Sequence, residues 1–250
     1  MARPAILYLG DSCLTGAAGY LAGVMSAAGW EFEYGSSAHR ATKEQCQSSR
    51  KLFVLSDYPA QLLDAEGQQA VVRQVEQGAG LLMIGGWESF HGTGGNWDGT
   101  PVGGMLPVEI STTDDRFNFD QPALLQACQP HPVLADLPWD TRPPGIGGLN
   151  RFQPKADSQV LLQAQAFAVH LQGHQFHFTP GPLHPVLVVG KFGQGRTAAL
   201  ATDVAPHWVG GLVDWGASRV KAQAPGAEEI EVGAYYAQFF QNLLRWVGNL

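Results

Sequence analysis

Short apolar runs alternate with amphipathic stretches through the first third of the chain. The predicted strands are 5–9, 32–34, 52–55 and 81–84, and the predicted helices between them are 14–29 and 62–77. Strands that are apolar throughout are typical of a parallel sheet, because both faces of such a sheet are covered by helices. The pattern therefore predicts an α/β fold with a mostly parallel sheet between layers of helices.

The second half of the chain shows a different pattern. Residues 92–156 are rich in Gly, Pro, Asp and aromatic residues, and they are too long and too irregular for an ordinary loop. We expect them to form a loop-rich insertion in a single domain spanning 1–250. Beyond them, 166–178 alternates like a strand or hairpin, and 185–189 with 196–201 predicts an antiparallel hairpin. A last helix is predicted from apolar residues at helical spacing, namely Tyr236, Phe239, Phe240, Leu243, Leu244 and Val247.

Composition narrows the possible partners. The chain of 250 residues has 22 acidic and 15 basic residues and a net charge of -7, which disfavours a nucleic-acid partner. Cys13, Cys46 and Cys128 are widely separated and lack C-x-x-C spacing, as is typical of reduced thiols. The sequence shows no signal-peptide pattern and no apolar run near the ~18 residues of a membrane span. We therefore expect a cytoplasmic protein without a membrane partner.

A glycine-containing turn follows the predicted strand 81–84 and carries several polar side chains. In an open parallel sheet, ligands bind beyond the carboxyl ends of the strands, so the loops at that edge should converge. The candidate residues on these loops are Asp11, Ser12, Asp57, Trp87, Glu88, Ser89, His91, Asp203 and His207. Structural roles are the alternative, since Asp11 and Ser12 suit a helix cap and Asp57 suits a turn.

Two of these candidates suggest acid–base chemistry. Asp203 and His207 lie four residues apart, and a turn that brings them together would let the carboxylate orient the imidazole as a general base. The alternative is that His207 stacks on Trp208. Ser89 lacks the flanking glycines of a nucleophile elbow, which disfavours a serine hydrolase. Glu88 and Ser89 can instead cap a following helix.

A histidine cluster offers the only pattern that suggests a metal. His170, His174 and His177 lie close in sequence, but no Cys or carboxylate joins them to complete a set of three or four ligands with supporting partners. We therefore expect no metal, and no motif in the chain predicts a cofactor.

Several segments resemble the class I glutamine amidotransferase-like superfamily. In that superfamily the segments corresponding to 52–59 and 82–89 end in a Gly-Gly-Pro turn and a G-x-C-x-G elbow, and the segment corresponding to 202–207 carries the catalytic histidine. A branch of glutamine amidotransferase-like cytoplasmic proteins resembles the chain more specifically. The resemblance to that branch rests on Ile84-Gly85-Gly86-Trp87-Glu88-Ser89-Phe90, Gly148-Leu149-Asn150-Arg151 and Ala201-Thr202-Asp203-Val204-Ala205-Pro206-His207-Trp208-Val209.

The resemblance implies a flavodoxin-like three-layer α/β/α fold, but it does not imply glutaminase activity. Trp87 stands where the superfamily has its nucleophilic cysteine, and Val209 stands where a glutamate would follow His207. Glutamine hydrolysis needs a thiolate at that elbow. Three hypotheses follow. The first is a small polar, carbohydrate-like ligand bound at the strand ends without glutaminase activity. The second is a hydrolase or isomerase that uses Glu88 or Asp203 with His207. The third is a structural module that forms a homo-oligomer.

Overall fold

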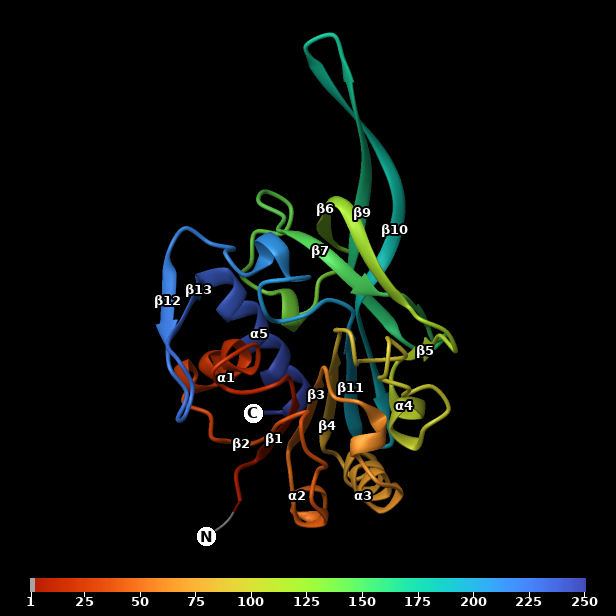
Figure 1. The fold of residues 1–250 in the computed structure, drawn as a ribbon, viewed down its shortest axis with the longest axis vertical. Coiled ribbons are helices and arrows are strands. Elements are labelled where there is room, and N and C mark those ends of the chain that lie inside the picture. Colours follow the sequence, from red (N-terminus) through yellow and green to blue (C-terminus); the bar gives the residue numbers. More distant parts are fainter. Residues whose placement is uncertain (1–2) are drawn as a thin grey trace.

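The computed structural model describes residues 3–250, which form one large mixed sheet with helices packed against it (Figure 1). The sheet has nine strands in the order β2-β1-β3-β4-β11-β10-β9-β6-β7. Neighbours from β2 to β11 are parallel, and every later pair is antiparallel. The strand bounds are β1 Ile6–Gly10, β2 Phe32–Gly35, β3 Leu52–Ser56, β4 Gly80–Ile84, β6 Arg116–Ala127, β7 Gly145–Asn150, β9 Gln159–Gln172, β10 Gln175–Phe192 and β11 Gly195–Leu200.

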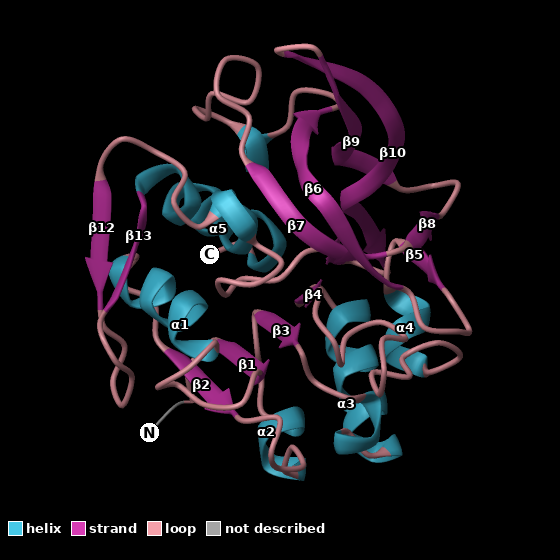
Figure 2. Ribbon diagram, turned by 45° about the horizontal axis from the view of Figure 1, so that its top comes forward, coloured by secondary structure: helices cyan, strands magenta, loops and turns pink. Residues whose placement is uncertain are grey.

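The parallel half matches the strands predicted from the apolar runs. β1, β3 and β4 are buried at every position, because helices cover both faces of this half. Figure 2 shows α1 and α5 on one side of these strands, and α2, α3 and α4 on the other. The helix bounds are α1 Ala18–Ala27, α2 Lys43–Gln47, α3 Ala65–Glu76, α4 Pro101–Met105 and α5 Ala234–Gly248, with 3₁₀ turns at Ala60–Leu62, Pro132–Leu134 and Gly210–Leu212.

The last helix is confirmed together with its buried face. The six residues that predicted α5 are all buried in the core. The helix is followed by Asn249, whose left-handed conformation (φ 48°) is a common way for a helix to stop.

The segment 92–156 contains more regular structure than its sequence pattern indicates. It holds α4, the long strand β6 and strand β7, and it holds β5 (Val108–Ile110) and β8 (Phe152–Pro154), which pair with each other. β6 and β7 join the main sheet at its antiparallel edge. β6 escapes detection because its burial does not alternate regularly, and because its pairing with β7 is interrupted between Asn118 and Ala123. Near the carboxyl end, β12 (Arg219–Ala222) and β13 (Ile230–Gly233) form another two-stranded sheet.

Both predicted hairpins are present. β10 and β11 pair antiparallel as predicted, with Gly193 in a left-handed conformation (φ 56°) at the turn. β9 and β10 form a much longer hairpin, turning at Gly173, and Figure 1 shows its end projecting well beyond the body of the molecule.

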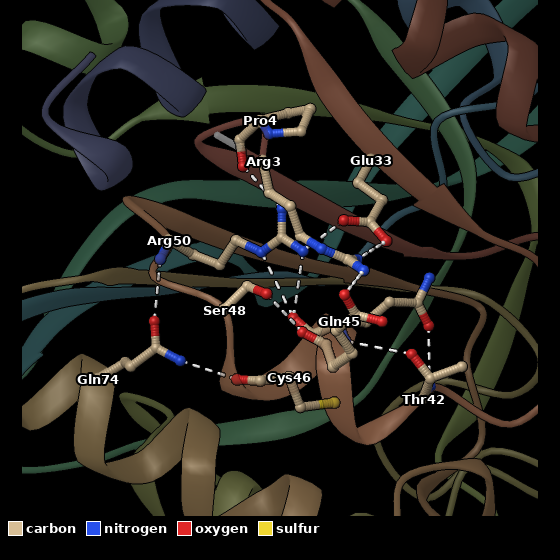
Figure 3. Close-up of polar contacts among 10 residues, drawn as sticks. Arg3, Pro4, Glu33, Thr42, Gln45, Cys46, Ser48, Arg50 and Gln74 are labelled. Atoms are coloured by element: carbon tan, nitrogen blue, oxygen red, sulfur yellow. Dashed lines mark hydrogen bonds and ion pairs between the residues drawn. The ribbon is translucent and has the colours of Figure 1, made fainter. Parts of the chain in front are cut away.

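A buried arginine ties the amino-terminal strands together (Figure 3). The Arg50 side chain is fully buried and donates to the carbonyl oxygens of Pro4 (2.7 Å) and Gln45 (3.2 Å). It also forms a 2.5 Å ion pair with Glu33, which lowers the pKa of that carboxyl against the opposing effect of its partial burial. Such satisfied pairing is what allows a charge to remain buried. No helix in residues 3–250 is long and apolar enough to cross a membrane.

Candidate functional site

Three carboxyl groups, two of them buried and that of Asp57 half-buried, gather at the carboxyl ends of the parallel strands. Asp11 follows β1, Asp57 follows β3 and Asp203 lies just beyond β11. The charge of Asp203 raises the pKa of both other residues, so the three groups lie within electrostatic reach of one another. The expectation that these loops converge is therefore met for the three aspartates, which we call the carboxyl cluster.

Burial is the main cause of the raised pKa values in the cluster. It raises the pKa of Asp57 to about 7 and that of Asp203 to about 6, and it raises the pKa of Asp11 well above its ordinary value. A buried carboxylate loses its hydration, so the neutral acid is favoured. Hydrogen bonds oppose this effect at each position: the backbone N–H groups of Val204 and Ala205 donate to Asp203.

Asp11 is held by tyrosines. The Tyr8 hydroxyl donates to Asp11 Oδ2 over 2.5 Å, and burial together with the Asp11 charge raises the pKa of Tyr8. Tyr34 donates its hydroxyl to the carbonyl oxygens of Gly10 and Asp11. Asp11 and Asp57 both adopt left-handed backbone conformations, with φ of 50° and 49°. Such conformations are uncommon outside glycine, and their occurrence at two adjoining strand ends marks this edge as a specialised region.

The turn after β4 is fixed by side chains from distant parts of the chain. The Ser89 hydroxyl donates to the Ile84 carbonyl (2.5 Å) and accepts from the Asp57 N–H (2.9 Å). Asn150, at the end of β7, accepts from the Gly86 N–H (2.9 Å) and donates to the Gly86 carbonyl (3.1 Å). The turn is thereby clamped to both β3 and β7.

Asp115 completes the clamp from the start of β6. Its Oδ1 atom accepts from Asn150 Nδ2 (2.7 Å) and from the Gly92 N–H (3.1 Å), while Oδ2 accepts from the His91 N–H (3.0 Å). Burial raises the pKa of Asp115, and these donors oppose the rise. The segment 92–156 therefore supplies the groups that shape the turn at the sheet edge.

An aromatic and charged rim lies beside the cluster. Trp87 is 49% exposed, which is unusual for an indole, and its ring meets the His207 ring edge-on with centroids 6.1 Å apart. The Arg116 guanidinium lies 4.7 Å from the centre of the Trp87 ring, within range of a cation–π interaction. Asp114 pairs with Arg116 at 2.8 Å.

The predicted acid–base pairs do not form. In residues 3–250 no hydrogen bond joins His207 to Asp203 or to Glu88, and Glu88 is exposed. The Glu88 backbone N–H instead donates to Asp57 Oδ1 over 2.6 Å. His207 is exposed and stacks on Trp208 with an interplanar angle of 17°, which was the alternative for this histidine. Its charge nevertheless lowers the pKa of Asp57, so His207 lies within electrostatic reach of the cluster.

The remaining predicted residues lie around the periphery. Ser12 is exposed, and its carbonyl accepts from the Ser36 hydroxyl. His91 pairs through Nδ1 with Asp98 Oδ1 at 2.7 Å, on its own loop. The proposed capping roles are wrong: α1 follows Ala17 without a side-chain cap, so neither Asp11 nor Ser12 caps it. The next helix after Glu88 and Ser89 begins only at Pro101, and its cap is Thr100.

No metal centre is visible in the described part of the chain, because residues 3–250 contain no group of three or more His, Cys, Asp or Glu side chains placed to hold an ion. His170 and His177 face each other across the β9–β10 hairpin. A hollow of about 680 Å³ lies elsewhere, lined by part of the segment 127–140, and none of the predicted site residues lines it.

Sequence reasoning missed the supporting residues Tyr8, Asp115, Arg116 and Asn150. Asn150 lies within the Gly148-Leu149-Asn150-Arg151 motif that marks the resemblance, and that motif was the available signal. Asp115 precedes and Arg116 begins β6, a strand that the pattern did not predict. Tyr8 lies inside an apolar run, where an aromatic residue is ordinarily core.

The family follows from a comparison with known proteins. The model of the family described as "Putative glutamine amidotransferase" matches residues 61–221, well over half of the chain. The chain belongs to this family. No curated protein matches the chain. The matched range of this glutamine amidotransferase-like protein includes the turn after β4 and the loop after β11.

Solved structures share the fold. Two cytoplasmic proteins of Salmonella typhimurium, STM3548 and STM1381, superpose with TM-scores of 0.72 each. Their identities to the chain are 20% and 22%, over 97% of this chain and 98% of each of theirs. A β-galactosidase from Rahnella sp. R3 gives a TM-score of 0.53 at 10% identity, over 98% of this chain and 31% of its own. At such identities these structures show the fold alone.

Proposed function

We propose that this amidotransferase-like protein binds a small, polar, carbohydrate-like ligand at the carboxyl ends of β1, β3, β4 and β11, and that it does not hydrolyse glutamine. The observation that carries the proposal is the carboxyl cluster of Asp11, Asp57 and Asp203. With pKa values of about 7 and 6 for Asp57 and Asp203, neutral and ionised carboxyls coexist near pH 7. A neutral carboxyl donates one hydrogen bond, whereas a carboxylate only accepts. That mixture suits hydroxyl groups, which both donate and accept.

Trp87 supports the same ligand class. Its exposed ring stands at the rim of the cluster, and an indole offers a flat apolar surface with one polar atom. Ligand sites commonly combine such a surface with a few placed polar groups. An exposed aromatic ring near hydrogen-bonding carboxyls fits a sugar ring that carries hydroxyls.

The absence of glutaminase activity is supported by the side chains at the turn. Trp87 has no nucleophilic atom, and the buried Ser89 hydroxyl is already bonded to Ile84 and Asp57. Cys13 is exposed on the loop after β1, where its Sγ lies 3.3 Å from the Thr15 hydroxyl. Acyl transfer from glutamine needs a nucleophile beside groups that hold the oxyanion, and this turn offers none.

The experiment is ligand titration followed by chemical-shift changes and calorimetry. The panel contains neutral monosaccharides, polyols, sugar acids, small amines and glutamine, with glutaminase activity measured in parallel. We expect binding of a neutral sugar or polyol that falls at least about tenfold in Asp57→Asn and several-fold in Trp87→Ala, given the ~0.5–1.5 kcal/mol of a good aromatic contact. Trp30→Ala is the matched control. Trp30 also has an arginine (Arg245) over its ring, but it lies just before β2 and outside the candidate site.

Two outcomes would contradict the proposal. Binding of amines alone would show that the cluster binds cations through ionised carboxylates and does not bind the hydroxyl groups of a sugar. The second outcome is glutaminase activity that persists through purification and is lost in one of the Cys→Ser variants. It would show that a cysteine outside the turn after β4 acts as the nucleophile.

A second candidate is acid–base catalysis by the carboxyl cluster. Asp57 and Asp203 are two carboxyls within mutual electrostatic reach, with pKa values near those that general acids and bases need. In this version of the hydrolase or isomerase hypothesis, Asp57 takes the place expected for Glu88. A bell-shaped dependence of turnover on pH, with both limbs altered in Asp203→Asn, would support it.

We also propose a cytoplasmic location and a flavodoxin-like three-layer arrangement for the parallel half. The location is supported by the name of the two Salmonella proteins, and the arrangement by the helices on both sides of β1, β3 and β4 (Figure 2).

A further inference from the structure

The end of the β9–β10 hairpin forms an isolated ribbon, which we call the arm (166–184). Pairing of β9 with β6 extends only to Gln165, and pairing of β10 with β11 begins only at Leu187. Within residues 3–250 the strands of the arm therefore pair with no strand outside the β9–β10 hairpin. His184 at its base stacks on Phe117, and Figure 1 shows the rest of the arm standing clear of the body. A lone two-stranded ribbon is marginal in water, which raises the question of what supports this one.

The arm has one apolar and one polar face. Directly opposed residues of paired strands share a face, and successive residues alternate between faces. The pairs Leu171–Phe176, Val169–Phe178 and Phe167–Pro180 thus lie on one face, and Leu183 lies on the same face opposite Gln165. The pairs on the other face are Gln172–Gln175, His170–His177 and Ala168–Thr179.

The apolar face is exposed. Phe176 and Phe178 are each 65% exposed, Leu171 is 64% exposed and Leu183 is 49% exposed. With the half-exposed Trp87, these are the large apolar side chains that residues 3–250 leave open to solvent. A regular apolar face on a ribbon is the pattern of a surface that packs against something.

We propose that the arm is a dimerisation element, in which the apolar faces of two arms pack against each other across a two-fold axis. A two-fold contact uses the same surface from both copies, and a ribbon with one apolar face is complementary to itself. Polar groups on the opposite face would remain in water.

The charge distribution favours a second copy as the occupant. The sequence from 158 to 190 contains no Asp, Glu, Lys or Arg, whereas the chain as a whole carries a net charge of -7. Two bodies of like charge repel each other, and contact through the uncharged arms keeps the two charged bodies apart. Charge separated by more than the ~8 Å screening length at physiological salt contributes little to that repulsion.

The available area is adequate for a dimer. Aromatic side chains bury about 150–250 Å² each when covered, so two phenylalanines and two leucines that are about half to two-thirds exposed would bury roughly 400–500 Å² per arm. Two arms then give about 900 Å² from these side chains alone, and the backbone and flanking residues bring the total to the ~1,200 Å² lower limit of a specific interface.

The test is the mass of the full chain in solution, measured by sedimentation equilibrium from about 1 to 100 µM. We expect a dimer that persists in about 1 M NaCl, because apolar contacts are not screened. Phe176→Ser with Phe178→Ser should weaken dimerisation at least about hundredfold, as loss of central aromatic contacts does. The matched control is His177→Ser with Thr179→Ser, which alters the polar face of the same ribbon and should leave the dimer intact.

Three results would overturn the proposal. These are a monomeric wild-type chain across the whole range, a dimer that survives the double phenylalanine substitution, and a dimer lost equally in the control. Far-UV circular dichroism and the unfolding midpoint of each variant show whether the body remains folded. A monomer that instead co-sediments with lipid vesicles would assign the apolar face to a membrane surface.

Discussion

Replacing Asp57 with asparagine should stabilise the protein above neutral pH and flatten the pH dependence of its stability. Asparagine tolerates the left-handed conformation at this position (φ 49°), and its side-chain oxygen can still accept from the Glu88 N–H. The charged groups that face Asp57 are Asp203, Glu88 and His207. The substitution removes the titrating group while preserving its shape.

The magnitude follows from the pKa of the folded state. Burial raises the pKa of Asp57 from 3.8 to about 7, so the folded protein holds its proton more tightly than the unfolded chain does. The resulting stabilisation is complete below pH 3.8, falls as the pH rises and is gone above pH 7. At 1.36 kcal/mol per pH unit, the loss across this window has an upper limit of about 4 kcal/mol. In Asp57→Asn this contribution to the pH dependence is absent.

The assay is urea unfolding at half-unit intervals from pH 4.5 to 8.5. We expect the wild-type free energy of unfolding to fall by about 2–4 kcal/mol across the range from the titration of Asp57, and the fall in Asp57→Asn to be smaller by at least half of that. Asp136→Asn is the matched control, because Asp136 is also left-handed (φ 59°) but exposed. An Asp57→Asn variant with the wild-type slope, or one less stable than the wild type at pH 8, would refute the assignment of a raised pKa to burial.

Three further substitutions test the contacts described above. Arg50→Ala should cost about 2–4 kcal/mol in urea unfolding, because the carbonyl oxygens of Pro4 and Gln45 lose this donor while Glu33 keeps only Arg3 as its partner. Arg219→Ala, which removes exposed ion pairs, should leave the midpoint almost unchanged. Asn150→Ala should cost about 2–4 kcal/mol by leaving the Gly86 N–H and carbonyl unsatisfied, and hydrogen exchange of the turn after β4 should accelerate; unchanged exchange would contradict the clamp. In Gly86→Ala the added methyl group would overlap the Asp57 carboxyl, so ligand binding in the titration panel should be lost while the unfolding midpoint falls only modestly.

The parts of the fold that sequence predicts are those in which local pattern and burial agree. The strands of the parallel half are buried on both faces and read as apolar runs, and α5 buries one regular stripe. β6 and β7 are different because β6 joins the sheet by pairing with β9, later in the chain, and β7 joins it only through β6. β6 is also half-exposed and interrupted. No local periodicity records such pairing.

In the candidate site, too, the sequence predicts some features and not others. Convergence of Asp11, Asp57 and Asp203 follows from a general property of parallel sheets, and the structure shows it. The expected pairing of His207 with Asp203 does not follow, because the Asp203 carboxyl turns back to the backbone N–H groups of its own loop. Side-chain direction in a turn depends on contacts such as those of Asn150, which lies 64 residues from the Gly86 it holds.

The loops at the carboxyl ends of the parallel strands contain features that lower the stability of the fold. Two aspartates adopt conformations that glycine would adopt more easily, and the charge of Asp203 adds to the burial that raises the pKa values of Asp11 and Asp57. At neutral pH such burial destabilises the folded state, and apolar or amide side chains would avoid the cost. Strained and destabilising groups persist at positions where binding or chemistry depends on them. The turn that presents Trp87 is, by contrast, held by hydrogen bonds with Asp57 after β3, Asp115 before β6 and Asn150 at the end of β7. A rigid turn beside an unfavourable carboxyl cluster therefore supports the proposed ligand site over the hypothesis of a purely structural module.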